Sequence, residues 1–393
     1  MNNKENNKNL LIIALIAVVN ALGYGIIIPI LYSYSHKFGL TDFQNGLLFA
    51  LFSICQFVST PIIGRLSDRY GRKPLLLASV AGTAGSFFMM AFAPGAAFLF
   101  LARALDGITA GNIPVLSAII SDTMPPKDRA KGFGIIGASF GFGFIFGPAI
   151  SAMTVGIADW LPFVISGVMA LIAVLITALI LPETNKHMGE VSHHKLFDLK
   201  KMASALVDPN IGVLLILTLI YFLSFSMFTY VFQPFSVKVL GMGPREIAMI
   251  FTLFGIFGLI SQLVLVQNIL KKFSLKKTYP AAIFMVAIAF LLMFASYALP
   301  LFIAASILLS LSNAMVNPLT QSIIANETDA KSQGVIMGLQ TSYMSIGQII
   351  GPILGGGLAE MNIHFPFLGA FVAVMICFWL SFKVFHKERL VEV

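Results

Sequence analysis

The sequence has very little charge for its length. Only 11% of its 393 residues are Asp, Glu, Lys or Arg, whereas 58% are hydrophobic. A soluble domain carries roughly a quarter of charged residues, which cover its water-facing surface. Because this chain lacks the charge for such a surface, its composition excludes an ordinary soluble protein and indicates a protein embedded in a bilayer.

Several chemical signatures are also missing. The two cysteines, Cys55 and Cys377, both lie in apolar runs, so no disulfide framework is indicated. No G-x-x-x-x-G-K-[ST] phosphate loop, catalytic triad or metal-ligand spacing occurs. We therefore expect no enzymatic activity, no cofactor, no bound metal and no direct use of ATP. The net charge of +8 resides in short loops between apolar runs, which is typical of membrane topology and not of nucleic-acid binding.

What the sequence has instead is a series of apolar runs, each long enough for one transmembrane helix of about 20 residues. Twelve are predicted, at 10–31, 44–64, 75–93, 97–119, 132–155, 161–181, 211–233, 246–268, 279–298, 301–325, 333–358 and 365–385. The polar stretch Pro182–Pro209 divides six from six. The predicted fold is an all-α membrane protein with two pseudo-symmetric six-helix bundles, residues 1–181 and 210–393, joined by a cytoplasmic loop, residues 182–209.

The cations are unevenly distributed between the two sides of the predicted membrane. One side carries 21 Lys and Arg residues and the other carries 3, with Arg103 inside a span. Cytoplasmic loops are enriched in Lys and Arg, so this asymmetry predicts that both termini are cytoplasmic. We expect a multi-pass protein of a bacterial-type inner or cytoplasmic membrane.

The two halves are related by an offset of 204 residues. This offset aligns Gly143, Gly147 and Pro148 with Gly347, Gly351 and Pro352, and it also aligns Pro114 with Pro318 and Arg72-Lys73 with Lys276-Lys277. One offset that holds in three separate regions indicates a duplicated six-helix unit, which is how many secondary transporters are built.

A cationic loop between the second and third spans carries the most specific motif. It reads GRLSDRYGRKP from Gly64 to Pro74 and fills every fixed position of the pattern G-x-L-x-D-R-x-G-R-K. With this loop the chain resembles the major facilitator superfamily. The resemblance implies alternating access and a cytoplasmic latch, for which the candidate residues are Gly64, Asp68, Arg69, Gly71, Arg72, Lys73 and Asp122.

Two contacts are expected within this latch. Asp68 is expected to cap or pair with a nearby helix N-terminus, and Arg72 is expected to pair with Asp122 at the inner end of the fourth span. The alternative is a solvated hairpin that only fixes topology. The second half has Lys272 at the position of Asp68, so a latch is expected on one side only.

The fifth span resembles the G-x-x-x-G-P-x-x-G-G motif of drug/proton antiporters with twelve helices, and the tetracycline/proton antiporters are most similar. Ser151 and Ala152 replace its last two glycines. Glycines every four residues also predict close helix packing. The candidate residues for this motif and its repeat are Gly143, Gly147, Pro148, Gly347, Gly351 and Pro352.

Arg103 and Asp106 are the only charged residues predicted within the membrane interior. They are three residues apart and so lie on one helix face. A charge there costs about 2.5–3.5 kcal/mol on insertion scales, so ionisable residues at this depth usually line a pathway. We interpret the pair as a proton-coupling or substrate site. A mutually satisfied structural pair is the alternative.

Polar residues within the spans are sparse. The candidates for a substrate cavity are Asn20, Tyr24, Gln56, Gln262, Asn313, Asn317, Gln340 and Tyr343. Interhelical hydrogen bonds are the alternative use of each. Together they suggest an apolar pocket with a few polar anchors, suited to an amphiphilic aromatic compound.

The prediction is therefore a secondary transporter that exports lipophilic compounds, tetracycline-like or multiple drugs, by proton antiport. The expected partners are a small lipophilic molecule, protons and membrane lipid, with a monomer as the working form. Transport of a sugar or other metabolite with different coupling, or a transport-inactive membrane binding protein, are the alternatives.

Overall fold

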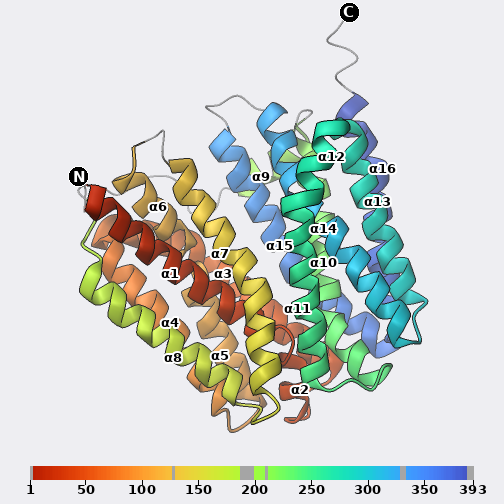
Figure 1. The fold of residues 1–393 in the computed structure, drawn as a ribbon, viewed down its shortest axis with the longest axis horizontal. Coiled ribbons are helices and arrows are strands. Elements are labelled where there is room, and N and C mark those ends of the chain that lie inside the picture. The colour runs from red at the N-terminus through yellow and green to blue at the C-terminus, as the bar shows by residue number, and fades with distance from the viewer. Residues whose placement is uncertain (1–2, 126–128, 186–198, 209–210, 328–332, 387–393) are drawn as a thin grey trace, which may run out of the picture. The chain divides into compact units, whose positions relative to one another are not determined.

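The computed structural model describes residues 3–125, 129–185, 199–208, 211–327 and 333–386. Every regular element within these ranges is a helix (Figure 1), as the predicted fold class requires. The helices are α1 Asn3–Ile27, α2 Leu31–His36, α3 Asp42–Tyr70, α4 Arg72–Ala91, α5 Ala96–Thr109, α6 Ile113–Thr123, α7 Arg129–Thr154, α8 Leu161–Ile180, α9 Leu199–Leu206, α10 Gly212–Lys238, α11 Pro244–Ile260, α12 Val266–Lys272, α13 Leu275–Phe294, α14 Leu299–Glu327, α15 Gln333–Met361 and α16 Phe365–His386.

Eleven helical segments of the described chain are long and apolar enough to cross a membrane. The twelfth predicted span is α15, which has 29 residues like α3 but carries Gln340, Ser342 and Gln348 among its apolar side chains. The central stretch predicted as a loop contains the short helix α9. These helices make the chain a multi-pass membrane protein.

One predicted span is broken into two helices, α5 and α6, by a 3₁₀ turn at Ala110–Asn112. The break follows from Pro114, which lies in the first turn of α6 and has no N–H to donate to the carbonyl of Ala110. The Gln56 side chain of α3 donates to that carbonyl instead, at 3.3 Å. The turn lies just after Asp106 on the chain, so it shapes the surroundings of the buried ion pair.

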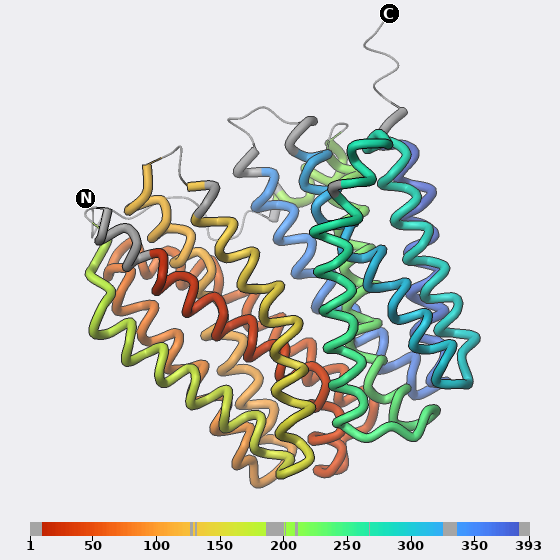
Figure 2. The backbone as a smooth tube through the Cα atoms, in the orientation of Figure 1, coloured from red at the N-terminus to blue at the C-terminus, as the bar shows by residue number. Residues whose placement is uncertain are grey.

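The described helices form two compact units. Unit 1 comprises residues 1–40, 51–197 and 244–252, and unit 2 comprises residues 41–50, 198–243 and 253–393. The start of α3 therefore groups with unit 2 and the start of α11 with unit 1. The bounds 1–181, 182–209 and 210–393 follow the chain in order and stay a prediction. The backbone trace in Figure 2 allows each segment to be followed.

Helix packing inside each unit repeats in the other. In unit 1, α1 packs on α7 and α8, and α4 packs on α8 and α5. In unit 2, α10 packs on α15 and α16, and α13 packs on α16 and α14. These are the helix pairs that the 204-residue offset relates, so the duplication extends from the sequence motifs to tertiary packing.

Glycines set the closest of these contacts. A Cβ atom at Gly143 of α7 would overlap the backbone of Ala21, and one at Gly147 would lie 2.7 Å from the Cα of Gly25. In unit 2, a Cβ atom at Gly347 of α15 would lie 2.7 Å from the carbonyl oxygen of Leu219 on α10. The backbones approach each other so closely that larger residues do not fit.

Gly143→Ala is therefore expected to destabilise the protein by about 3 kcal/mol, because the backbone of Ala21 cannot move away as a flexible side chain would. Gly141→Ala on the same helix is the matched control, since nothing lies within 4 Å of a Cβ atom there. Thermal unfolding of the two purified variants measures the difference. Equal midpoints would show that close packing at Gly143 is not required.

Candidate functional site

The loop predicted as a latch is a one-residue turn between α3 and α4. Gly71 joins the two helices with φ of 104°, a left-handed conformation that other residues rarely adopt. A Cβ atom at Gly71 would also lie 2.5 Å from the Glu183 carboxylate. Both constraints require glycine at this position, and the turn brings Arg72 directly beneath the end of α3.

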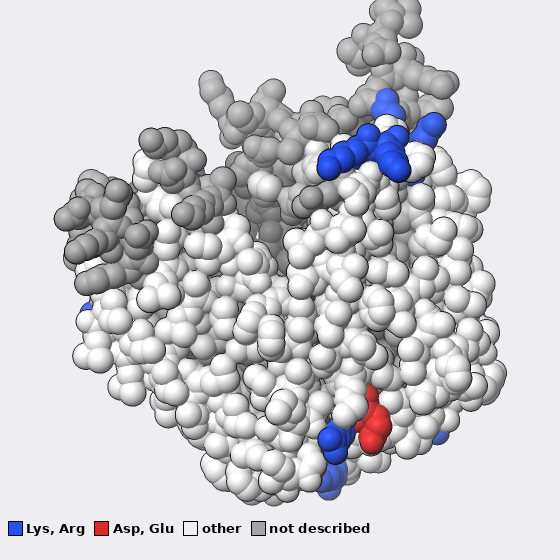
Figure 3. Space-filling model, in the orientation of Figure 1, with Lys and Arg blue, Asp and Glu red and all other residues white. Residues whose placement is uncertain are grey.

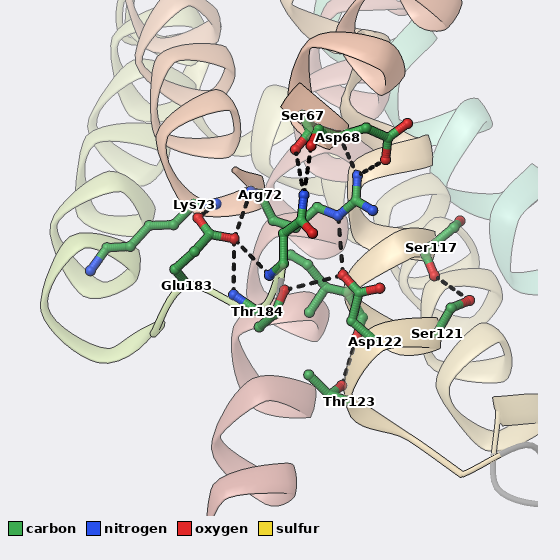
Figure 4. Close-up of polar contacts among 12 residues, drawn as sticks. Ser67, Asp68, Arg72, Lys73, Ser117, Ser121, Asp122, Thr123, Glu183 and Thr184 are labelled. Carbon is green, nitrogen blue, oxygen red and sulfur yellow. Dashed lines mark hydrogen bonds and ion pairs between the residues drawn. The ribbon is translucent and has the colours of Figure 1, made fainter. Parts of the chain in front are cut away.

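Arg72 is the centre of a polar network at this turn (Figure 4). Its guanidinium donates to Asp68 Oδ1 at 2.5 Å, to Ser67 Oγ at 2.7 Å and to Asp122 Oδ2 at 3.1 Å. The residue is only 8% exposed. Arg72 thus ties the last turn of α3 to the end of α6, and the expected pair with Asp122 is present.

Glu183, just after α8, completes the network from a distant part of the chain. Its carboxylate accepts the backbone N–H groups of Arg72 at 2.9 Å and of Lys73 at 3.0 Å. It therefore caps α4, where an anion is favoured by the free N–H groups and the helix dipole. The expectation that Asp68 would contact a helix N-terminus is not met, because Asp68 pairs with the Arg72 side chain and Glu183 occupies the cap.

The remaining motif residues take different roles. Lys73 donates through Nζ to the carbonyl of Ala178 on α8, at 2.8 Å. Arg69 is exposed and lies 5.1 Å from the ring centroid of Tyr70. A Cβ atom at Gly64 would make only an ordinary contact with Pro114. The network thus contains Arg72, Asp68, Asp122 and Glu183, and Arg69 lies outside it.

The ionisable pair in the membrane interior lies on α5. Arg103 Nη1 donates to Asp106 Oδ2 at 2.8 Å, and the two residues are 2% and 5% exposed. The guanidinium also lies 4.4 Å from the ring centroid of Phe52 on α3, a cation–π contact. Both charges are therefore removed from lipid and held within unit 1.

A small cavity of about 30 Å³ adjoins this pair. Its lining residues are Asn20, Tyr24, Phe52, Thr83, Phe87, Asp106 and Ala110. That volume has room for about one or two water molecules. Asp106 therefore faces a space that water can occupy, although the residue is almost fully buried.

Unsatisfied polar atoms lie close to this cavity. Asn20 Nδ2 donates to Asn112 Oδ1 at 2.8 Å, which joins α1 to the 3₁₀ turn. Asn20 Oδ1, Asn112 Nδ2 and Arg103 Nε are buried and have no partner among the described residues. Buried polar groups normally find a partner, so this part of unit 1 has hydrogen-bonding capacity for water or a ligand.

Unit 2 has a smaller cavity whose lining carries no formal charge. It is about 10 Å³ and is lined by Leu217, Thr218, Tyr221, Phe222, Tyr279, Val316, Asn317, Thr320 and Gln340. Tyr221 donates to Asn313 Oδ1 at 2.5 Å beside it. Gln321 donates to Gln340 Oε1 at 3.0 Å. Most polar groups of this lining therefore have a hydrogen-bond partner, since Thr320 also donates to Tyr279 at 3.2 Å and Thr218 donates to the carbonyl of Leu214.

The predicted cavity residues thus separate into groups. Asn20 and Tyr24 line the cavity beside Asp106, and Asn317 and Gln340 line the cavity of unit 2. The other four line neither cavity. Three of them form hydrogen bonds: Gln56 with the carbonyl of Ala110, Asn313 with Tyr221, and Tyr343 with the carbonyl of Met202 in α9. The fourth, Gln262, is exposed on a π-helical turn at Ser261–Leu265. A substrate role for any of them stays a prediction.

The other end of α3 is also anchored, here within unit 2. Asp42 pairs with Lys238 of α10 at 2.5 Å, and Tyr230 of α10 donates to the carbonyl of Asp42. The N–H of Phe43 donates to Glu360 of α15 at 3.1 Å. One helix is therefore held by polar contacts in its first turn and, 26 residues later, at Asp68.

Comparison with known protein families identifies the family to which this chain belongs. A model described as Major Facilitator Superfamily matches residues 13–243 and 214–392. The chain belongs to the major facilitator superfamily. Multidrug resistance protein 2 of Bacillus subtilis is 28% identical over 94% of this chain and 92% of its own length. Tetracycline resistance protein, class H, of Pasteurella multocida is 27% identical over 98% and 97%.

Another relative within the superfamily is the quinolone resistance protein NorA of Staphylococcus aureus, 27% identical over 92% of each chain. The fold also matches solved structures. A bacterial homolog of the human lysosomal transporter Spinster superposes with a TM-score of 0.80, at 16% identity over 99% of each chain. The human organic anion transporter MFSD10 gives 0.67, at 21% identity over 96% of this chain and 99% of its own. These matches support the predicted all-α membrane fold.

Glu183 and Asn112 were not among the predicted site residues. Glu183 lies in the run Leu181-Pro-Glu-Thr184 that closes α8, and the Pro182–Glu183 pair after an apolar run was the available signal. Asn112 follows Gly111 and precedes Pro114, which marks a helix break inside a predicted span. In both cases the local signal was present, but the partner is distant in sequence.

Proposed function

We propose that this protein is a secondary active transporter that exports lipophilic or amphiphilic compounds, of the tetracycline-like or multidrug type, in exchange for protons. The observation that carries the proposal is the Arg103–Asp106 pair, buried inside unit 1 beside a cavity of water size. Ionisable residues inside a membrane protein usually serve a pathway. The resistance proteins named among the relatives support a drug as the exported compound.

In this proposal Asp106 exchanges the proton. The carboxylate borders the cavity, so water can deliver a proton to a group that lipid cannot reach. Protonation removes the negative charge that balances Arg103 and leaves the guanidinium with Phe52 as its described partner. A buried cation without a counter-charge is unfavourable, so proton binding shifts the preference between conformations.

Alternating access is proposed to use the two ends of α3. The Arg72 network holds its last turn to α4, α6 and α8, while Asp42 holds its first turn to α10 and α15. We infer that the Arg72 network is the cytoplasmic latch and that both termini lie in the cytoplasm. A monomer in the cytoplasmic membrane is the proposed working form.

The substrate is inferred from the polarity of the two cavities. Each lining has three aromatic rings beside amide and hydroxyl groups. The rings are Tyr24, Phe52 and Phe87 in unit 1 and Tyr221, Phe222 and Tyr279 in unit 2. A sugar requires many hydrogen bonds, whereas an amphiphilic aromatic compound requires a few polar anchors within an apolar site.

A susceptibility panel tests the proposed activity. Cells expressing the protein are expected to tolerate higher concentrations of several lipophilic drugs, and to accumulate less of each, than cells carrying the empty vector. Collapse of the proton gradient should remove the difference in accumulation. Unchanged drug tolerance, or uptake of a sugar instead, would contradict the proposal.

A further inference from the structure

The buried cation of unit 1 contacts both a carboxylate and an aromatic ring. Arg103 donates to Asp106 at 2.8 Å, and its Cζ atom lies 4.4 Å from the ring centroid of Phe52. Its Nε has no hydrogen-bond partner among the described residues. The middle of the face drawn in Figure 3 shows no charged side chain among the described residues that are visible, and Arg103 is only 2% exposed. The charge of Arg103 is therefore stabilised from inside the protein.

Close helix packing holds the Phe52 ring in this position. Gly107 is one turn after Arg103 on α5, and a Cβ atom there would overlap the carbonyl oxygen of Phe52 on α3. One turn after Phe52, the Gln56 side chain donates to the carbonyl of Ala110 at 3.3 Å. Phe52 is itself only 8% exposed. The ring thus lies beside the guanidinium because the two helix backbones that carry them touch.

The ring distinguishes the two protonation states of Asp106. The face of an aromatic ring carries a negative partial charge and attracts cations. While Asp106 is ionised, Phe52 faces an ion pair whose opposite charges largely cancel, so this attraction is small. Once Asp106 binds a proton, the same ring faces an uncompensated guanidinium and the attraction grows. The ring therefore stabilises the protonated state of Asp106 more than the ionised state.

The neighbouring helices are described as bringing uncharged groups to this pair. On α1 and α3, the ionisable groups that act on Arg103 are Tyr24 and Cys55, and a phenol and a thiol are both largely uncharged at neutral pH. α4 lines the adjoining cavity with Thr83 and Phe87, which do not titrate. Stabilisation of the uncompensated cation is thus left to the ring.

We propose that Phe52 is a positioning residue that holds Arg103 when Asp106 is protonated and thereby raises the proton affinity of Asp106. This role rests on the proposed function, in which Asp106 exchanges the proton. A desolvated cation–π contact of ordinary strength corresponds to about a tenfold difference in proton binding. Phe52 lies on α3, whose last turn carries Asp68, so proton binding also acts on the helix that bears the proposed latch.

Infrared difference spectra of the purified full-length protein test this role without drug. Protonation of Asp106 appears as a carboxyl band when the pH is lowered, and the band is identified by its absence in Asp106→Asn. Phe52→Leu should lower the proton affinity read from this band about tenfold. Replacement of Phe52 by a trifluorinated phenylalanine should do the same, because fluorine withdraws electron density from the ring face while the ring keeps nearly the same size.

Phe87→Leu is the matched control for these spectra. The Phe87 ring lines the same cavity and is as well buried, but the ring over the Arg103 guanidinium is that of Phe52. Both leucine variants enlarge the cavity, so the control separates the effect of added water from that of the lost ring face. Phe87→Leu should bind the proton as wild type does. An unchanged proton affinity with the fluorinated ring, or equal shifts in the two leucine variants, would overturn the proposal.

A thermal-unfolding cycle tests the contact with Arg103 without any titration. Wild type, Phe52→Leu, Asp106→Asn and the double variant are compared at a pH where wild-type Asp106 is ionised. Phe52→Leu should lower the midpoint more in the Asp106→Asn background than in wild type, because the ring there faces an uncompensated cation. Equal losses in the two backgrounds would overturn the proposal and leave proton exchange by Asp106 in place. A wild type without a titrating Asp106 band would instead contradict the proposed function, and this role of Phe52 with it.

Discussion

Asp106→Asn is expected to abolish drug export while the protein remains folded. Asparagine has the shape of the protonated carboxyl group but cannot release a proton, so the variant is fixed in the proton-loaded form. If Asp106 exchanges protons, the native protein must tolerate a neutral side chain beside Arg103 during each cycle. Drug accumulation should therefore rise to that of cells without the protein, with a thermal midpoint within a few degrees of wild type.

Asp159→Asn is the matched control for this prediction. Asp159 is a partly exposed carboxylate of unit 1 that pairs with Lys37, and surface pairs contribute little to stability. This variant should export drug as wild type does. The structural alternative for the Arg103–Asp106 pair makes the opposite prediction for Asp106→Asn. Removal of one partner of a purely structural buried pair costs about 3–5 kcal/mol, so a large loss of folded protein would favour that alternative.

Asp68→Asn is expected to reduce export to background without unfolding the protein. Arg72 keeps Asp122 and Ser67 as partners in this variant, so the turn remains intact. What is lost is the charge that ties the last turn of α3 to the guanidinium, and with it the proposed cytoplasmic latch. Glu183→Gln should have a similar effect, because a neutral amide caps the N-terminus of α4 less well than a carboxylate.

Arg69→Gln tests whether export requires every residue of the sequence motif or only those in the Arg72 network. Arg69 belongs to the motif but is exposed, and among the described residues it is not one of the hydrogen-bond or ion-pair partners of Arg72. Its replacement should reduce export far less than Asp68→Asn does. Initial rates of drug efflux from preloaded cells, normalised to the amount of protein in the membrane, measure both variants. Undiminished efflux in Asp68→Asn would refute the latch.

The pair between Arg72 and Asp122 could be predicted in part, because the order of the spans determines the side of the membrane on which each residue lies. Asp122 lies at the end of the fourth span, and Arg72 lies in the loop between the second and third spans, on the same predicted side. Hydrophobic run length and the cation count place both residues on the same side, and the latch implied by the resemblance to the major facilitator superfamily singled out this pair. The buried Arg103–Asp106 pair was similarly predictable, since three-residue spacing on one helix is a local property.

The cap by Glu183 could not be predicted, because it joins residues 111 positions apart through a loop whose path the sequence does not define. The same limit applies to Asn20 and Asn112, which meet across two helices. Side-chain partners of this kind depend on helix rotation and packing distance. Glycine spacing indicates which faces are close, as at Gly143, but not which polar atoms then meet.

Proton movement in reconstituted vesicles tests the central proposal most directly. Purified protein in vesicles with an acidic interior and a pH-sensitive dye inside should release protons when a transported drug is added outside. Wild type and Asp159→Asn are predicted to show this drug-dependent release, and Asp106→Asn is predicted to show none. Drug transport by wild type without proton release, or full release by Asp106→Asn, would contradict proton antiport through Asp106.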